Sequence, residues 1–351
     1  MPKYAINGRY IVRKLTGQER FASELVAELD KIVQNDDFVI VVPEYAREIP
    51  AYKNISVVRY GKIKSHLWEQ VSFYNYIKRN KLISINLTTT CPFLSPDIVC
   101  IHDAAYYEIS SLLSQNIYGK LSLLWHKLLI HSASKKAKLI LTVSEYSKKR
   151  LSKIMNIPED KIFILRNAWQ HIERINQDES IFSKLPIDIR TGGFYLALSS
   201  LAPQKNFFWI EEVAKRNPSN QFIICGGSSS NLDLSIDKTI RNLHFTGYIP
   251  DEQIKALMKK CKAFIHPAIY EGFGIPPLEA LACGAQIIIS STTCLPEIYG
   301  KSAHYIDPYN YDYNLDEILN EPVQDVHKTL AKYNWTDEAK KLYNIILTAN
   351  G

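Results

Sequence analysis

The chain has 351 residues, of which 46% are hydrophobic, so it is long enough for two packed domains of ordinary globular composition. No run of about 18 apolar residues occurs and the N-terminus lacks a signal-peptide pattern, so we expect a cytoplasmic protein without a membrane span. The six cysteines form no CxxC pair, which argues against a disulfide framework and against a zinc site.

The formal net charge of +6 is unevenly distributed along the chain. Residues 1–170 contain 25 Lys and Arg against 15 Asp and Glu, whereas the remainder carries a net negative charge. A basic half favours an anionic partner, which would be lipid, nucleic acid or an anionic substrate. Charge that merely keeps the protein soluble explains the same excess.

Short apolar strands alternate with helices over the first half of the chain, which is typical of a doubly wound α/β sheet. A strand at residues 4–7 is followed by a loop that reaches Gly17 and then by an amphipathic helix over residues 19–29. Such a loop is where these folds contact phosphate, but no GxGxxG pattern occurs, and a plain turn also explains Gly17. His102 directly follows a strand at residues 99–101, at the sheet edge where ligands bind.

Residues 117–137 predict a longer helix with leucines and Trp125 on apolar rows and several lysines beside them. Aromatic and basic side chains together favour an anionic membrane surface. A core helix with one solvated face explains the pattern almost as well, because amphipathicity does not separate the two.

The periodic pattern is lost over residues 166–189, which predicts the boundary between two domains. The second domain then begins with a strand at residues 193–198 and a loop that carries Lys205. A lysine in such a loop can meet a leaving pyrophosphate as a point charge.

The most informative stretch is Tyr270–Gly284, a glycine-containing loop and short helix between apolar runs at residues 262–267 and 286–290. Pro276 and Pro277 suit the first turn of that helix. Strand, loop, helix and strand in this order predict a βαβ crossover in a parallel sheet.

Two glutamates lie in this unit, Glu271 in the loop and Glu279 in the helix. Gly272 and Gly274 allow a ligand to approach the backbone closely, and a helix N-terminus favours an anion. Two carboxylates beside an anion site suit a ligand with both hydroxyls and phosphate, such as a nucleotide-sugar. Taken alone, each glutamate is better explained as an ordinary surface charge.

The whole stretch Tyr270–Gly284 resembles the E-x7-E signature of the retaining GT-B glycosyltransferases of family 4, the glycosyl transferases group 1. The resemblance continues downstream through Leu295–Ile298 and Asp307–Pro308, and upstream through Phe245–Asp251. It is specific over residues 195–310 and looser elsewhere.

This resemblance implies an α/β protein with the GT-B fold, in which two Rossmann-like doubly wound domains face each other across a cleft. Residues 1–170 would form the acceptor-side domain and residues 191–330 the nucleotide-sugar-binding domain, joined by a linker at residues 171–190. Residues 331–351 would form a helix that packs back towards the first domain.

The resemblance also implies roles for single residues. Glu271 would bind the hydroxyls of the donor sugar, Lys205 would meet the leaving pyrophosphate, and His102 would lie near the donor sugar; these three are the expected catalytic residues. The other expected donor-binding residues are Gly17, Phe273, Gly274, Ile275 and Glu279, the last of them on the ribose. Relatives carry a second cation in the Lys205 loop, where this chain has Ser200 and Gln204.

The implied activity is transfer of a hexose, with mannose or rhamnose favoured, from a nucleotide-sugar to a glycan acceptor in lipopolysaccharide or capsule biosynthesis. No Asp-x-Asp motif occurs, so neither a metal nor another cofactor is expected. The expected partners are the nucleotide-sugar, a lipid-linked oligosaccharide and anionic lipid at the inner face of the cell membrane, with no nucleic acid. A nucleotide-sugar epimerase or phosphorylase on the same fold, and a non-catalytic nucleotide-binding homologue, are the alternatives.

Overall fold

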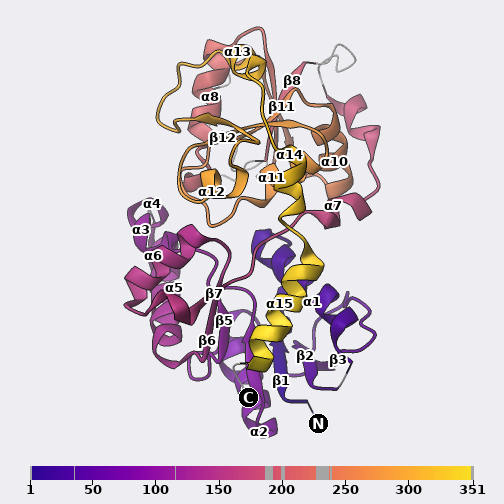
Figure 1. The fold of residues 1–351 in the computed structure, drawn as a ribbon, viewed down its shortest axis with the longest axis vertical. Helices are drawn as coiled ribbons and strands as arrows, with labels where there is room; N and C mark the ends of the chain where they lie inside the picture. Colours follow the sequence, from indigo (N-terminus) through magenta and orange to yellow (C-terminus); the bar gives the residue numbers. More distant parts are fainter. Residues whose placement is uncertain are drawn as a thin grey trace. The chain divides into compact units, whose positions relative to one another are not determined.

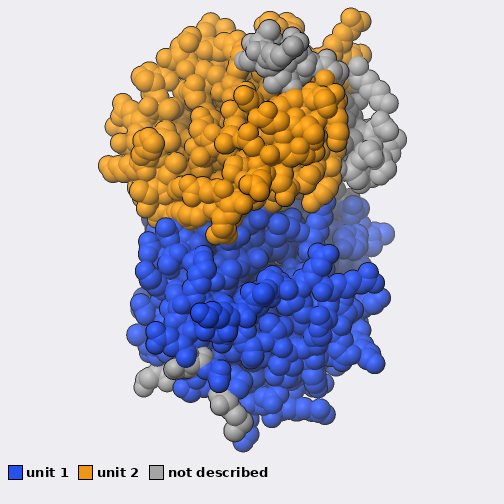
Figure 2. All heavy atoms as spheres, turned by 90° about the vertical axis from the view of Figure 1, so that its right-hand side faces the viewer, with its two compact units in different colours: residues 1–167, 334–351 blue, residues 168–333 orange. Residues whose placement is uncertain are grey.

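The computed structural model describes residues 2–34, 36–114, 116–185, 193–198, 202–226, 237 and 239–348. The chain forms two compact units (Figures 1 and 2). Unit 1 comprises residues 1–167 and 334–351, and unit 2 comprises residues 168–333. The chain therefore passes from unit 1 into unit 2 once and returns to unit 1 for its last segment.

Unit 1 is built on a parallel sheet that has, in its described residues, seven strands in the order β3-β2-β1-β4-β5-β6-β7. The strands are β1 (Tyr4–Asn7), β2 (Phe38–Val42), β3 (Ser56–Arg59), β4 (Ile83–Asn86), β5 (Ile98–Cys100), β6 (Leu139–Thr142) and β7 (Ile162–Ile164). The helices are α1 (Gly17–Ile32), α2 (Tyr74–Asn80), α3 (Ala105–Glu108), α4 (Ser110–Leu113), α5 (Ile117–Lys136), α6 (Glu145–Met155) and α15 (Trp335–Thr348). Shorter turns are η1 (Gly8–Val12), the π-helical η2 (Trp68–Phe73) and η3 (Glu159–Lys161).

Unit 2 is built on a second parallel sheet, with six described strands in the order β10-β9-β8-β11-β12-β13. The strands are β8 (Phe194–Leu198), β9 (Gln221–Cys225), β10 (Leu243–Gly247), β11 (Ala263–His266), β12 (Gln286–Ser290) and β13 (His304–Ile306). The helices are α7 (Gln170–Arg174), α8 (Phe207–Arg216), α10 (Asp251–Lys260), α11 (Ile275–Ala282), α12 (Leu295–Tyr299), α13 (Leu315–Asn320) and α14 (Val326–Ala331). The 3₁₀ turns are η4 (Glu179–Lys184) and η6 (Pro203–Lys205).

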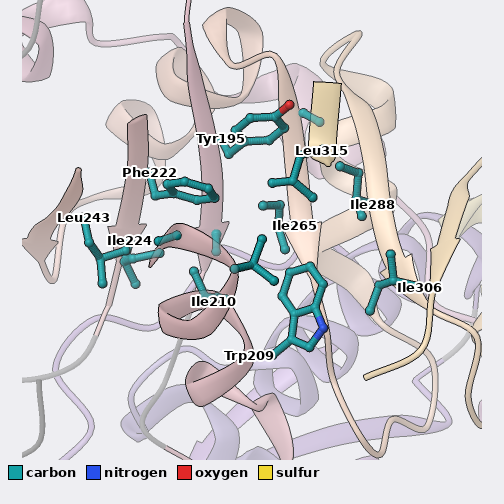
Figure 3. Close-up of a cluster of buried hydrophobic side chains, with 14 of the residues drawn as sticks. Tyr195, Trp209, Ile210, Phe222, Ile224, Leu243, Ile265, Ile288, Ile306 and Leu315 are labelled. Carbon is teal, nitrogen blue, oxygen red and sulfur yellow. The ribbon is translucent and has the colours of Figure 1, made fainter. Parts of the chain in front are cut away.

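The core of unit 2 holds α8 firmly against the sheet (Figure 3). Tyr195 and Phe222 of neighbouring strands stack with ring centroids 5.4 Å apart, and Trp209 of α8 is fully buried in the same cluster. The Trp209 indole Nε1 donates to the Asn310 carbonyl oxygen at 2.7 Å. Because α8 is held in this way, the loop between β8 and α8, which carries Lys205, has one fixed end.

The strand order of each sheet reverses direction once, in unit 1 between β1 and β4 and in unit 2 between β8 and β11. At such a switch point, neighbouring strands lead into connections that run in opposite directions, and α/β proteins bind ligands in the resulting crevice. Residues that bind a ligand are therefore expected at these two switch points, one in each unit.

The division of the chain differs from the expected one at the boundary. Residues 171–185, most of the expected linker, form α7 and η4 within unit 2, where α7 adjoins α11 and η4 adjoins α10. The terminal helix α15 packs on α1 of unit 1, with the Phe21 and Trp335 rings 6.1 Å apart and Thr336 donating to Glu28 at 2.8 Å. A loss of hydrophobic periodicity thus marked short docked helices instead of a free connection.

Candidate functional site

Two loops meet at the switch point of unit 2, one after β8 and one after β11. The Gln204 carbonyl oxygen accepts a hydrogen bond from the Ile269 N–H at 2.8 Å. The Asn206 amide Nδ2 donates to the carbonyl oxygens of Pro267, at 3.2 Å, and Pro308, at 2.8 Å. These bonds fix the Lys205 loop against the Glu271 loop, so both residues lie at the same edge of the sheet.

Glu271 lies between two nitrogen donors. Its Oε1 accepts hydrogen bonds from Lys205 Nζ and from His266 Nε2, the latter at 2.9 Å, and its side chain is 13% exposed. Burial alone would raise the pKa of the Glu271 carboxyl, but Lys205 and His266 outweigh it and lower the pKa to about 2. Burial also lowers the pKa of His266. Glu271 is therefore an ionised carboxylate at neutral pH.

The second carboxylate oxygen of Glu271 is available to a ligand. Oε2 has no hydrogen-bond donor among the described residues, and it is not among their buried polar atoms. Lys205 carries three N–H groups, so it can bond Glu271 and an anionic ligand at once. One oxygen thus fixes the orientation of the carboxylate, and the other can accept a hydroxyl.

Glu279 shows the same arrangement on α11. Its Oε1 accepts a hydrogen bond of 2.5 Å from His171 Nε2, and Oε2 has neither a described donor nor full burial. His171 is 2% exposed and is held on α7, where Trp169 donates to the Leu330 carbonyl and Gln170 to the Tyr333 carbonyl. The two predicted glutamates are therefore each oriented by a buried histidine.

The N-terminus of α11 provides fewer donors than the sequence predicted. Pro276 and Pro277 do occupy its first turn, so two of the first three helical positions have no N–H. The backbone N–H groups of Phe273, Gly274 and Ile275 remain, and none of them has an acceptor in the described part of the chain. An anion at this point would be bound by these three groups.

Gly274 is required by the backbone at this point. Its φ of +84° is in the left-handed region, and an added Cβ would lie 2.8 Å from Leu295 Cδ2. Tyr299 donates its hydroxyl hydrogen to the Gly274 carbonyl oxygen, which fixes the same peptide. A side chain here would displace the N–H groups that begin α11.

In unit 1, Gly17 and His102 lie at the carboxyl edge of the sheet. Gly17 is the first residue of α1, and the neighbouring Gln18 accepts a hydrogen bond from the Thr89 N–H at 3.3 Å. His102 packs edge-on against Phe21 at 4.9 Å and donates from Nε2 to the Leu87 carbonyl oxygen at 2.9 Å. Burial lowers the pKa of His102 to about 4, so its imidazole is neutral at pH 7 with Nδ1 as an acceptor.

The depressed pKa of His102 predicts a pH dependence of stability. In the unfolded chain the imidazole titrates near 6.5, whereas the folded protein keeps it neutral down to about pH 4. Acid therefore protonates the unfolded chain first, and stability falls by about 3 kcal/mol as the pH falls through this window. His102→Gln should lose stability less steeply between pH 6.5 and 4, measured by urea unfolding beside His131→Gln at an exposed position. Parallel curves for the parent and His102→Gln would contradict this assignment.

A buried ionic network lies at the switch point of unit 1, and no sequence pattern predicted it. Arg9 Nη1 lies 2.7 Å from Glu69 Oε2, and Glu69 Oε1 accepts from Asn7 at 2.9 Å and from Thr90 at 2.7 Å. Asn7 also donates to Asn86 across the ends of β1 and β4 at 3.1 Å. Because these partners are 21 to 79 residues apart, no local spacing indicates them.

The histidines behind the glutamates were also missed. His266 ends β11, so its position at the carboxyl end of a strand is the same signal that indicated His102. His171 fell in the segment interpreted as a linker and carried no signal. Relatives carry a second cation at one of two positions in the Lys205 loop. In this chain Ser200 lies outside the described residues, and Gln204 is uncharged.

The described residues contain neither a membrane-crossing helix nor a metal-binding cluster. No helix there is long and apolar enough to cross a membrane. No three His, Cys, Asp or Glu side chains there are grouped so that they would hold a metal ion. All six cysteines are free thiols.

Comparison with known proteins gives one family and a common fold. Residues 186–327 match the family described as glycosyl transferases group 1. Over 248 residues, or 67% of this chain, the sequence is 26% identical to O-antigen chain mannosyltransferase B from Escherichia coli, and the match spans 65% of that relative's length.

Solved structures resemble almost the whole chain. Sucrose-phosphate synthase from Thermosynechococcus elongatus matches with a TM-score of 0.75 and 13% identity over 99% of this chain and 100% of that one. Anabaena Alr3699/HepE in complex with UDP and glucose matches with a TM-score of 0.66 and 16% identity over 99% of each. Identities this low show a shared fold alone.

The two parallel α/β units and these structural neighbours define a protein with the GT-B fold, so the predicted fold class is confirmed. Within that fold class, residues 186–327 match the family of glycosyl transferases group 1, which relates this part of the chain to glycosyltransferases.

Proposed function

We propose that the protein is a retaining hexosyltransferase that uses a nucleotide-sugar as donor. The observation that carries this proposal is the Glu271 carboxylate at the switch point of unit 2, with one oxygen held by Lys205 and His266 and the other available. Support comes from the group 1 domain and from the Anabaena neighbour, which was solved with UDP and glucose.

The donor would be bound along unit 2 by groups of different chemistry. Glu271 Oε2 accepts a hydroxyl hydrogen of the hexose, and Glu279 Oε2 accepts from the ribose. Lys205 and the N–H groups of Phe273, Gly274 and Ile275 meet the negative charge that grows on the diphosphate as the glycosidic bond breaks. Gly17 and His102 are proposed for the pyrophosphate and the donor sugar, as the family resemblance implies.

Retention follows in this proposal from attack on the same face of the sugar that the diphosphate leaves. The acceptor hydroxyl forms the new bond to the anomeric carbon, and a phosphate oxygen of the departing diphosphate takes its proton. No protein nucleophile is then needed. Lys205 and the backbone donors supply the positive charge, so neither a metal nor another cofactor takes part.

Mannose is the favoured hexose, because the relative from Escherichia coli is named as an O-antigen chain mannosyltransferase. The acceptor would be a growing, lipid-linked oligosaccharide of a surface polysaccharide, and transfer would take place on the cytoplasmic side of the membrane.

A panel of nucleotide-sugars tests this function. The purified protein should be stabilised against heat by one nucleoside diphosphate and its sugar, and should transfer that sugar to an oligosaccharide acceptor with excess chelator present. NMR of the product should show the anomeric configuration of the donor. A product with the inverted anomeric configuration would contradict the retaining mechanism. Turnover that stops with chelator and returns with magnesium would contradict the proposal that no metal takes part.

A further inference from the structure

Exposed apolar side chains are concentrated in unit 1. Of the large hydrophobic residues that are exposed in the described part of the chain, thirteen lie in unit 1 and three in unit 2. Four of the thirteen follow one another along α5: Ile117, Leu121, Leu124 and Leu128, which are 78%, 63%, 55% and 44% exposed. We call these four residues the α5 face.

The α5 face is a continuous stripe. At 3.6 residues per turn, its four positions fall within an arc of about 60° on the helix surface. The opposite side of the same helix is buried in the core of unit 1 through Leu129, Ile130 and Ala133. The helix is thus apolar on two sides, and the described residues of the chain cover only the inner side.

A second exposed apolar group adjoins this helix. It consists of Leu67 and Val71 of the η2 region and Phe93 and Leu94 of the loop before β5, and we call it the flanking patch. Its members and α5 are joined through Phe93, whose N–H donates to Gln70 at 2.8 Å and whose carbonyl accepts from Ser132 at 2.6 Å.

The charge around both groups is positive. No Asp or Glu occurs from residue 109 to residue 144, a segment that contains five lysines, and none occurs from residue 49 to residue 68. Lys120, Lys135 and Lys136 of α5 are exposed, as are Lys62 and Lys64 before the flanking patch. Lys136 lies over the Phe93 ring, with Nζ 5.1 Å from its centroid.

We propose that the α5 face and the flanking patch dock on an anionic lipid bilayer, with α5 lying in the plane of the interface. On an anionic bilayer, the leucines would enter the interface and the lysines beside them would meet the lipid phosphates. Anionic membrane surfaces bind this combination of apolar and basic side chains. A second copy of this chain is the poorer occupant, because a symmetric contact would bring the lysines of both copies together. This inference is independent of the transferase reaction.

Vesicle sedimentation tests the proposal. The protein should bind vesicles of phosphatidylcholine mixed with phosphatidylglycerol, bind those of phosphatidylcholine alone weakly, and be released by salt. Leu124→Gln with Leu128→Gln should weaken binding at least about tenfold, since two apolar side chains no longer enter the interface. Leu347→Gln, at a position of α15 that is also 44% exposed, should bind like the parent.

Circular dichroism and light scattering complete the test by showing that the variants fold and remain monomeric. Turnover on a water-soluble acceptor should be unchanged in the double variant, so this proposal can fail while the proposed function stands. Equal binding to both kinds of vesicle, or parental binding by the double variant, would overturn it. So would a parent protein that is dimeric and becomes monomeric in the double variant.

Discussion

Glu271→Gln should lower kcat on the order of 100-fold or more, while the affinity for the free nucleoside diphosphate stays the same or increases. The carboxylate would orient the sugar hydroxyls as the anomeric centre becomes positive, so its bonds strengthen in the transition state. Loss of one such preorganised group typically costs about 10²–10³ in turnover. Because the substitution also removes the negative partner of Lys205, it leaves that lysine freer for phosphate.

Steady-state kinetics and diphosphate titration measure the two effects separately. Glu212→Gln is the matched control, since Glu212 likewise has two nitrogen partners, Lys215 and Arg216, on α8 of the same unit. Urea unfolding shows whether Glu271→Gln is folded. A variant that keeps parental kcat would remove Glu271 from the reaction.

Lys205→Ala should lower kcat/KM by about 30- to 1,000-fold, or about 2–4 kcal/mol of transition-state stabilisation. Lys205 is proposed to meet the charge that grows on the leaving diphosphate. It is also the strongest influence that lowers the pKa of Glu271, so without it that pKa should rise from about 2 towards its ordinary value of 4.5. The loss should therefore be larger at mildly acidic pH than at neutral pH.

Lys215→Ala controls for the loss of one ion-paired lysine from unit 2, because Lys215 pairs with Glu212 at 2.9 Å and with Asp237 at 3.2 Å. Its pH–rate profile should match that of the parent. If Lys205→Ala also keeps the parental turnover, another cation meets the diphosphate.

The fold could be predicted largely from the sequence because most of the parallel strands, such as β2 and β12, are short apolar runs that alternate with helices. Hydrophobic periodicity did not predict the local structure where tertiary packing determines it. The hydrophobic pattern gives no sign that residues 68–73 form a π-helix, in which the fully buried Trp68 donates from its indole to the Tyr60 carbonyl at 2.7 Å. The segment around α7 was interpreted as a linker because its helices are short, and buried apolar residues such as Ile172 and Ile181 are too few to form a periodic pattern.

The candidate site could be predicted only in part. The local signature identified Glu271, Glu279 and the α11 turn, and Lys205 was identified by its loop after a strand and by the family resemblance, but its contact with Glu271 was not predicted. Of the two orienting histidines, His171 could not be predicted from a local pattern, because it lies 108 residues from Glu279, whereas His266 lies at the carboxyl end of a strand, as His102 does. The sequence pattern also predicted more backbone N–H donors at the N-terminus of α11 than the structure has, because the two prolines in its first turn carry no N–H.

Calorimetric titration with free nucleoside diphosphates tests most directly the claim that unit 2 holds the donor between two oriented glutamates. The parent should bind one diphosphate, and Glu279→Gln should weaken that binding by about 1–3 kcal/mol, because the ribose contact is made equally in the ground and transition states. Glu271→Gln should leave the binding intact or stronger. Loss of diphosphate binding in Glu271→Gln with parental binding in Glu279→Gln would contradict the two assignments, and no binding of any diphosphate by the parent would contradict the donor site itself.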